Sequence, residues 1–190
     1  MAVAKKLEKY FTYEEYLEWE LDEGERYELI DGVPYAMAGA SLRHQGIQVA
    51  LAGILYNHLQ GKKEQKCRLF TAGTNVKLFA DRDTVVQPDL LVVCDPKKME
   101  DGKAVKGAPN LVIEILSPSN TRHDLVTKFD MYKEAEVPEI WYVDPEREIV
   151  LTYRLGGEQE YIGGIWGGNE MEAGILPGLV IDLAVIFEDM

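Results

Sequence analysis

Cysteine and histidine are both scarce in this sequence. Its 190 residues include two cysteines, Cys67 and Cys94, and three histidines, His44, His58 and His123. The cysteines have neither metal-ligand spacing nor the pattern of a disulfide framework. Cys94 ends an apolar run and is expected to be a small core residue. The histidines lie far apart and show no zinc-ligand spacing, so the sequence argues against a zinc module and against a disulfide-stabilised scaffold.

Long apolar runs are absent as well. No run approaches the roughly 18 residues of a membrane-spanning helix, and the first twenty residues lack the apolar segment of a signal peptide. We therefore expect a soluble, cytoplasmic protein that has no membrane partner. The length predicts one domain over residues 1–190, because single domains commonly contain about 100–200 residues.

Basic residues are too few to balance the acidic ones. The chain has 20 lysines and arginines against 33 aspartates and glutamates, a formal net charge of -13. Excess negative charge disfavours non-specific binding to nucleic acid or to an anionic membrane. A local binding face stays open, since two basic clusters, residues 62–68 and 97–106, are either solvated loops or phosphate contacts.

The predicted elements mix strands and helices. A capping box at Thr12 and Glu15 opens a short helix, and Asp31-Gly32 marks a hairpin between two strands. An apolar stripe predicts a helix over residues 42–60. Further strands are predicted over residues 67–80, 84–94, 111–116, 139–144 and 148–155, a helix from Thr121 to about Ala135, and short edge strands in the glycine-rich remainder. This pattern predicts an α/β or α+β fold in which helices pack against a sheet.

One acidic residue stands inside an apolar strand. Residues 111–116 read Leu-Val-Ile-Glu-Ile-Leu, apolar on both faces, which is typical of a central strand. Glu114 lies near the middle of this strand. An ionised carboxylate is costly to bury unless it is paired or bound to a metal, so Glu114 is a candidate functional residue.

Asp89 is a second carboxylate in the same kind of setting. It follows Pro88 and leads directly into the apolar run 90–94, the other predicted central strand. Two carboxylates on neighbouring strands repel and raise each other's pKa. A hard cation such as Mg²⁺, which prefers oxygen ligands, removes that repulsion. The alternative is that each acid separately caps a backbone amide or pairs with a surface base.

Lys128 supplies a charge of the opposite sign. Leu125, Phe129 and Tyr132 form the apolar stripe of the helix that follows, and Lys128 lies on or beside this stripe. A lysine that faces the sheet would be a partner for Glu114. The alternative is a lysine that extends past the edge of the core to water.

These residues belong to a longer resemblance. The segment QPDLLVV, with Glu114 in LVIEILSPS standing 25 positions after Asp89, resembles the metal-binding motif of the PD-(D/E)XK nuclease superfamily. The stretches SPSNTRHDLVTKFDMYKEAEVPEIWYVDP and RYELIDGVPYAMAGASLRHQ resemble one branch of it. That branch is a large family of restriction-endonuclease-like proteins once catalogued as a domain of unknown function. The resemblance covers about residues 12–145 and is weaker beyond.

The resemblance implies a restriction-endonuclease-like fold. This fold is a central mixed sheet flanked by helices, here with an extra N-terminal hairpin and C-terminal strands. Asp89 and Glu114 match the two core metal ligands, and the backbone carbonyl of Ile115 would be a third ligand to Mg²⁺ or Mn²⁺. The superfamily lysine usually stands two residues after the glutamate, where this chain has Leu116. The branch moves this lysine to the next helix, and Lys128 is the matching position.

Two further residues match the family by position. Glu28 matches an acid of the N-terminal hairpin, which would hold metal-bound water; its alternative is an exposed strand acid next to a tight turn. His44 matches a histidine early in the second helix, and its alternative is an ordinary helix-face histidine.

Two functional hypotheses follow. The first is a metal-dependent DNA endonuclease, because phosphodiester hydrolysis needs charge stabilisation and a positioned water. Lys128 would orient that water and stabilise charge, since its pKa should stay high near two carboxylates. The second is a catalytically inactive nuclease-fold protein that binds nucleic acid or assists assembly, which Leu116 and the net charge favour. We also expect a homodimer, formed through an edge strand such as residues 148–155 or through the apolar C-terminus.

Overall fold

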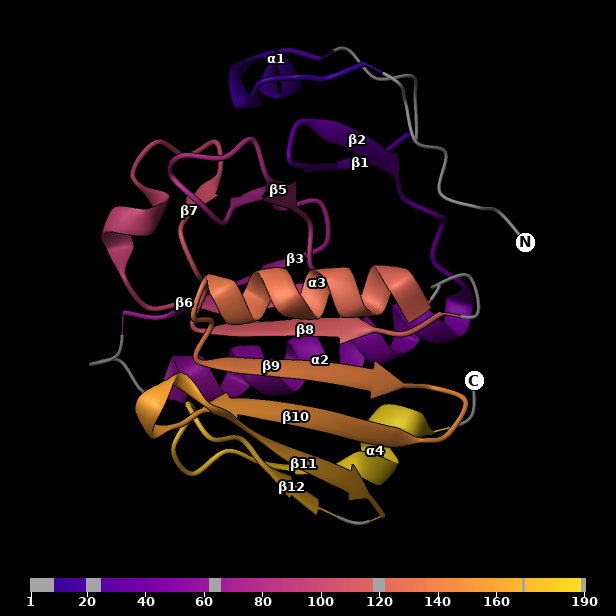
Figure 1. The fold of residues 1–190 in the computed structure, drawn as a ribbon. Coiled ribbons are helices and arrows are strands. Elements are labelled where there is room, and N and C mark those ends of the chain that lie inside the picture. The colour runs from indigo at the N-terminus through magenta and orange to yellow at the C-terminus, as the bar shows by residue number, and fades with distance from the viewer. Residues whose placement is uncertain (1–8, 20–24, 62–65, 118–121, 169, 189–190) are drawn as a thin grey trace.

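The computed structural model describes residues 9–19, 25–61, 66–117, 122–168 and 170–188. A large sheet carries a helix on each face, and a smaller sheet lies beside it (Figure 1). This arrangement confirms the predicted α+β fold.

The helices are α1 (Tyr13–Leu17), α2 (Leu42–Gly61), α3 (Arg122–Glu134) and α4 (Leu183–Phe187), with short 3₁₀ turns at Pro96–Met99 and Gly157–Gln159. The strands are β1 (Tyr27–Ile30), β2 (Val33–Ala36), β3 (Arg68–Thr71), β4 (Val76–Lys77), β5 (Val85–Val86), β6 (Leu90–Val93), β7 (Val105–Lys106), β8 (Leu111–Ile115), β9 (Glu139–Asp144), β10 (Ile149–Leu155), β11 (Tyr161–Gly167), β12 (Glu170–Glu172) and β13 (Val180–Asp182).

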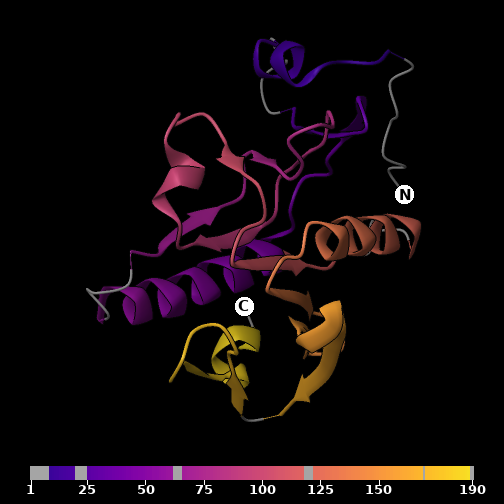
Figure 2. The same cartoon turned by 60° about the vertical axis from the view of Figure 1, so that its left-hand side comes forward.

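The larger sheet has six strands in the order β11-β10-β9-β8-β6-β3. β8 and β9 run parallel, and the other neighbours are antiparallel. The chain passes from β8 to β9 through α3, which lies on one face of the sheet, while α2 covers the opposite face (Figures 1 and 2). β6 and β8 are interior strands, which confirms their predicted central position.

Alternation along β8 divides the core into two layers. Leu111, Ile113 and Ile115 pack in the layer that contains the buried stripe of α2. Val112 packs in the layer that contains Tyr132 of α3. Successive side chains of a strand point to opposite faces, so the even-numbered residues of β8 face α3.

The two covering helices follow the predicted patterns. Ser41 Oγ accepts the backbone N–H of His44 at 3.2 Å and caps the start of α2. The predicted apolar stripe of α2 is buried at Ile47, Leu51, Leu55 and Leu59. For α3, the predicted cap Thr121 lies outside the described residues. Within the described ranges, no helix has the length and apolar character needed to cross a membrane.

The smaller sheet, in the order β2-β1-β5-β4-β7, packs with α1. Thr12 and Glu15 form the predicted capping box at the start of α1. The β1–β2 hairpin turns at Asp31 and Gly32, whose φ angles are 47° and 77°. Positive φ at both central residues is the geometry that an Asp-Gly hairpin turn requires, and the turn fixes the register of β1, which carries Glu28.

Two predicted strands are divided between the two sheets. Residues 84–94 form β5 in the smaller sheet and β6 in the larger one, instead of one strand. Pro88 lies in the break, because proline lacks the N–H that a continuous ladder needs. Residues 67–80 likewise form β3 and β4, separated by a turn in which Gly73 has φ of 91°. The first break places Asp89 at the junction of the two sheets.

The prediction that residues 148–155 form an edge strand is wrong. Residues 149–155 form β10, which lies between β9 and β11 and is therefore an interior strand. The apolar C-terminus packs in the same core layer as α2, through Leu176, Leu179, Ile181, Leu183, Ile186 and Phe187. The C-terminal segment therefore keeps Val180 and Val185 as its exposed large apolar side chains, and its part in a dimer stays a prediction.

Cys67 and Cys94 are joined in a disulfide, contrary to the expectation from their spacing. They extend the antiparallel pairing of β3 with β6, in which Arg68 lies opposite Val93. The cysteines are 27 positions apart in the chain, so their contact depends on strand register, which their spacing does not reveal. Cys94 also packs against the core, as predicted.

Candidate active site

Asp89 and Glu114 come together where the two sheets meet. In the antiparallel pairing of β6 with β8, Leu90 lies opposite Ile113. Continuing this register by one residue places Asp89 opposite Glu114. Alternation along β8 directs Glu114 to the face covered by α3. Strand register thus produces the predicted neighbourhood of the two carboxylates.

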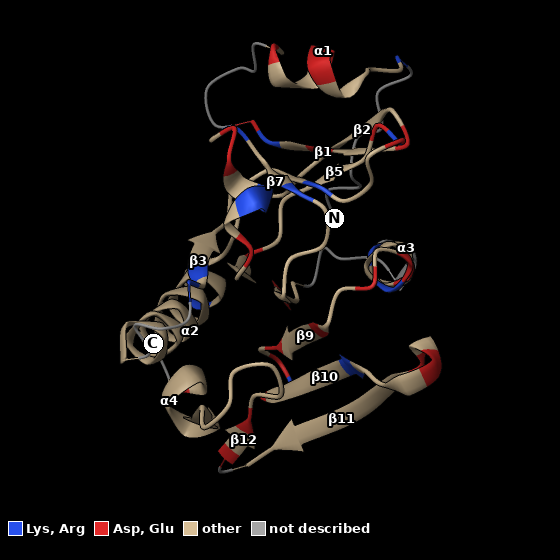
Figure 3. Cartoon of the chain, turned by 90° about the vertical axis from the view of Figure 1, so that its left-hand side faces the viewer, with Lys and Arg blue, Asp and Glu red and all other residues tan. Residues whose placement is uncertain are grey.

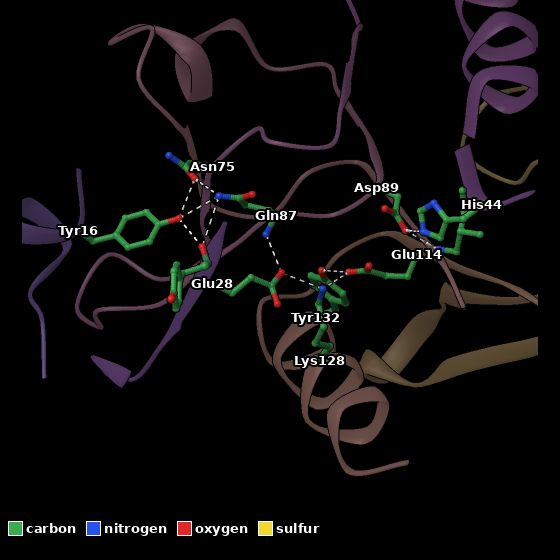
Figure 4. A network of polar contacts seen from close by, with 11 residues as sticks. Tyr16, Glu28, His44, Asn75, Gln87, Asp89, Glu114, Lys128 and Tyr132 are labelled. Atoms are coloured by element: carbon green, nitrogen blue, oxygen red, sulfur yellow. Dashed lines mark hydrogen bonds and ion pairs between the residues drawn. The ribbon is translucent and has the colours of Figure 1, made fainter. Parts of the chain in front are cut away.

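Lys128 reaches Glu114 from α3. Its Nζ lies 2.7 Å from Glu114 Oε1 and 2.9 Å from Glu28 Oε1, so one ammonium joins a carboxylate of each sheet (Figure 4). The side chains are largely buried, with exposed fractions of 13% for Lys128, 12% for Glu114 and 10% for Glu28. The alternatives for Lys128 and Glu28, a lysine extended to water and an exposed strand acid, are therefore wrong.

Tyr132 is a site residue that sequence reasoning missed, because its position in an apolar stripe predicted only a core role. Its ring is buried, but its hydroxyl donates to Glu114 Oε1 at 2.6 Å, the oxygen that also contacts Lys128. Tyr132 lies one helical turn after Lys128, on the same face of α3. The signal that could have identified Tyr132 in the sequence is its hydroxyl, because it lies in the same helical stripe as the candidate lysine.

Asp89 is held from both sides through one oxygen. Its Oδ2 accepts the backbone N–H of Ile115 at 2.8 Å and lies 3.1 Å from Nε2 of His44 in the first turn of α2. The amide of Gln48 donates to the Asp89 backbone carbonyl at 2.9 Å. His44 is buried, so it belongs to the site. Ile115 is also brought to the site, through its N–H; a ligand role for its carbonyl stays a prediction.

Glu28 is fixed by the segment that joins β5 to β6. Its Oε1 accepts the backbone N–H of Gln87 at 2.8 Å. The side-chain amide of Gln87 donates to Tyr16 Oη and to Asn75 Oδ1, both at 3.0 Å. A continuous set of polar contacts therefore runs from α1 to the site lysine (Figure 4). Sequence reasoning missed Gln87, Tyr16 and Asn75, because nothing in their spacing connects them.

Charges within this buried cluster shift one another's protonation. Burial raises the pKa of Glu114 to about 7; Lys128 opposes this shift, and Asp89 and Glu28 add to it. Burial disfavours the charged form of Lys128, but the carboxylates of Glu114 and Glu28 outweigh it and raise the pKa of Lys128. Burial likewise lowers the pKa of His44, and Asp89 reverses this, so the net direction is upward. The two carboxylates thus favour the charged form of Lys128.

The donor set suits a hard divalent cation. Asp89 and Glu114 each use one oxygen in the contacts above, and their other oxygens, Oδ1 and Oε2, accept no hydrogen bond from the described residues. A cation would relieve the repulsion that raises the pKa of Glu114. No three metal-ligating side chains converge in the described ranges. Backbone, water or substrate oxygens would therefore complete the coordination, as is usual for Mg²⁺.

Fold and family agree on the class of protein. A mixed sheet with a helix on each face, and with acids of two strands meeting a lysine, defines a restriction-endonuclease-like protein of the PD-(D/E)XK class. The model of the Uma2 family, described as "Putative restriction endonuclease", matches residues 13–184. The chain belongs to the Uma2 family, and the predicted resemblance is confirmed.

The individual relatives add little about activity. Two proteins of Synechocystis sp. (strain ATCC 27184 / PCC 6803 / Kazusa), slr1290 and sll1609, are both described as uncharacterized. The first is 35% identical over 119 residues, which cover 63% of this chain and 60% of that protein. This chain therefore spans about three fifths of its length. The second is 25% identical over 156 residues, which cover 81% of this chain and 86% of that protein.

A solved structure shows the same fold. It comes from Anabaena variabilis ATCC 29413 and is described as a putative nuclease belonging to DUF820. The TM-score is 0.73 at 20% sequence identity, and the match covers 93% of this chain and 97% of that one.

Proposed function

We propose that this protein is a metal-dependent DNA endonuclease that hydrolyses phosphodiester bonds. The observation that carries the proposal is the convergence of Asp89, Glu114 and Lys128 from three separate elements. The family description and the nuclease-like fold support the same reaction class.

Asp89 and Glu114 would hold the cation, Mg²⁺ or Mn²⁺, with the carbonyl of Ile115 as a third ligand. Such an ion polarises a phosphoryl oxygen and lowers the pKa of a bound water. Both carboxylates lie at strand ends, and rigid elements hold ligands more accurately than loops do.

Lys128 provides a positive charge in a fixed place. Its ammonium is held between Glu114 and Glu28, and its raised pKa keeps it protonated. It therefore stabilises the negative charge that develops on the phosphoryl oxygens and orients the attacking water, without removing a proton from it. This is the role expected from the sequence.

Glu28 and His44 act through their neighbours. Glu28 fixes the ammonium of Lys128 and is the acid expected to hold metal-bound water. His44 contacts Oδ2 of Asp89, so Oδ1 of Asp89 would be the oxygen that binds the ion. Both are positioning residues in this proposal.

The second candidate is a catalytically inactive nuclease-fold protein that binds nucleic acid or assists assembly. Leu116 favours it, because this residue occupies the usual lysine position and packs in the apolar layer under α3. The net charge of -13 also favours it. The contact of Lys128 with Glu114 counts against it, because the missing charge arrives from the helix.

Cleavage of supercoiled plasmid with Mg²⁺ or Mn²⁺ tests the proposal. A plasmid pool with random inserts avoids the loss of signal that a narrow target sequence would cause. We expect Asp89→Asn and Lys128→Met each to reduce nicking by at least about 100-fold. The matched controls, Asp95→Asn and Lys133→Met, change exposed residues of the same charges outside the site and should retain nicking. Full nicking by Asp89→Asn contradicts the proposal, and no nicking by the wild type supports the inactive alternative.

A further inference from the structure

α2 has large apolar side chains exposed on its outward face, among uncharged polar residues such as Gln45 and Asn57, as well as a buried apolar stripe. Residues 44–61 contain no Asp, Glu, Lys or Arg, although 28% of the chain is charged. On the outward face, Leu42, Val49 and Tyr56 are exposed by 82%, 73% and 55%. Exposed apolar residues that lie together on one surface mark an interaction site, and these three remain exposed in the described chain.

The exposed apolar residues are spaced for helix packing. Leu42, Val49 and Tyr56 recur every seven positions and form one stripe about 21 Å long. Gly53 lies beside this stripe, and a Cβ added there would meet no described atom within 4 Å. Glycine destabilises the interior of a helix relative to alanine. Because packing within the chain does not require it, Gly53 fits a close approach by another helix.

α4 lies beside α2 and also has an exposed apolar residue. It contacts α2, and its Val185 is 52% exposed. Figure 3 shows α2 and α4 as neighbouring ribbons that are tan over most of their length, whereas α1 and α3 carry charged segments. We call the surface formed by Leu42, Val49 and Tyr56 the α2 face.

We propose that the α2 face binds a second copy of this chain, with α2 packed antiparallel to α2 of the other copy. Val49 lies midway between Leu42 and Tyr56, so the stripe is complementary to itself about a two-fold axis through Val49. That axis places Val49 against Val49 and Leu42 against Tyr56 of the other copy. Isologous contacts of this kind are the commonest in soluble oligomers.

Charge also favours a second copy at this surface. Two chains that each carry a net charge of -13 repel at most approaches. This repulsion is weakest at the α2 face, because eighteen consecutive residues, 44–61, carry no acidic or basic group apart from two histidines. The inference is independent of the proposed nuclease activity, since it uses none of the site residues.

β11 is the rival surface. It forms one end of the larger sheet, it contains no charged residue, and Ile162 and Ile165 are exposed by 69% and 75%. Its glycines, however, have a reason within the chain: a Cβ on Gly164 would approach Trp166 Nε1 to 3.1 Å. Ile162 and Ile165 also point to opposite faces of the sheet, so they form no single apolar stripe. We therefore place the contact on α2.

Sedimentation of the full chain at micromolar concentrations tests the inference. We expect the wild type to sediment at twice the mass of the 21.5 kDa chain. Val49→Glu should sediment at the single-chain mass, and Ile165→Glu should behave as the wild type. A monomeric wild type overturns the proposal, and so does a dimer that survives Val49→Glu. A dimer lost only in Ile165→Glu assigns the contact to β11.

Cross-linking tests the two-fold axis itself. The chain's two cysteines, Cys67 and Cys94, are bonded to each other. A cysteine introduced by substitution is therefore the free thiol available for cross-linking. Val49→Cys should form a covalent dimer under mild oxidation. Leu42→Cys alone should not, whereas Leu42→Cys combined with Tyr56→Cys should. Failure of Val49→Cys to cross-link in a folded dimer contradicts the antiparallel arrangement.

Discussion

Lys128 Nζ lies 2.7 Å from Glu114 Oε1. The lysine that pairs with the site glutamate therefore comes from helix α3 and not from the glutamate's own strand, β8. Leu116, two residues after Glu114, packs instead in the apolar layer under α3. α3 lies over that layer, and its Lys128 points toward the Glu114 carboxylate (Figures 1 and 4). The charge that the superfamily places on the strand is therefore present, although the residue that carries it has moved.

Removing this charge should destabilise the protein in a pH-dependent way. Lys128→Met leaves Glu114 and Glu28 without their counter-ion, and we expect a loss of about 3–5 kcal/mol in the free energy of unfolding at about pH 8. Burial already raises the pKa of Glu114 to about 7. A carboxyl with a higher pKa in the folded state binds more protons there, so its contribution to stability falls as pH rises through about 4.5 to 7. The substitution raises this pKa further.

Urea unfolding at about pH 5 and about pH 8 measures the difference. The loss in Lys128→Met should be smaller at the lower pH, where Glu114 is protonated and carries no unpaired charge. Lys133→Met, on the exposed side of α3, should change stability by less than about 0.5 kcal/mol at either pH. An equal loss in Lys128→Met at both pH values contradicts the assigned electrostatics.

Tyr132 and Tyr142 should respond oppositely to loss of the hydroxyl. Tyr132→Phe removes a 2.6 Å hydrogen bond to Glu114 and should cost about 1.5–3 kcal/mol, as for a bond to a charged group. Tyr142 is also buried, but its hydroxyl has no hydrogen-bond partner among the described residues. Tyr142→Phe should therefore be neutral or stabilising. Thermal and urea unfolding of the two variants provide the comparison, and a larger loss in Tyr142→Phe would show that its hydroxyl has a partner.

Reduction of the disulfide should lower stability. Cys67 and Cys94 are 27 positions apart, and in the chain-entropy description a loop of this length contributes about 3–4 kcal/mol. Cys94→Ser and the reduced wild type should lose similar amounts in urea unfolding. If reductant leaves the wild-type transition unchanged, the two cysteines are not bonded in solution.

Glu139 provides a control for stability without function. It is fully buried on β9 and accepts hydrogen bonds from Trp141, Arg154, Gly174 and Ile175 at 2.7–3.2 Å. Glu139→Ala leaves these donors unpaired and should cost about 3–5 kcal/mol, while metal binding and nicking persist wherever the variant is folded. Loss of metal binding by the folded variant would show that the site depends on more than its own residues.

Local patterns in the sequence were enough to predict several parts of the fold. The capping box at Thr12, the Asp31-Gly32 turn and the stripe of α2 each depend on residues close together in the chain, and all three are confirmed. Glu114 and Asp89 could be identified because a carboxylate in an apolar strand is costly without a partner. The contact between Glu114 and Lys128 followed from the faces of one strand and one helix.

The features that sequence reasoning missed depend on contacts between distant segments. Gln87 contacts Glu28 across 59 positions and Tyr16 across 71, and no local pattern connects them. The disulfide depends on the register of β3 with β6. Residues 149–155 read as an edge strand because their pattern does not reveal that β11 adds beyond them.

The central claim is that Asp89 and Glu114 bind a divalent cation beside Lys128, and calorimetric titration with Mn²⁺ tests it without any need for the target sequence. We predict that the wild type and Asp95→Asn each bind one ion per chain at this site, and that Asp89→Asn binds it at least about tenfold more weakly. Equal binding by Asp89→Asn and the wild type, with all three proteins folded, would contradict the claim.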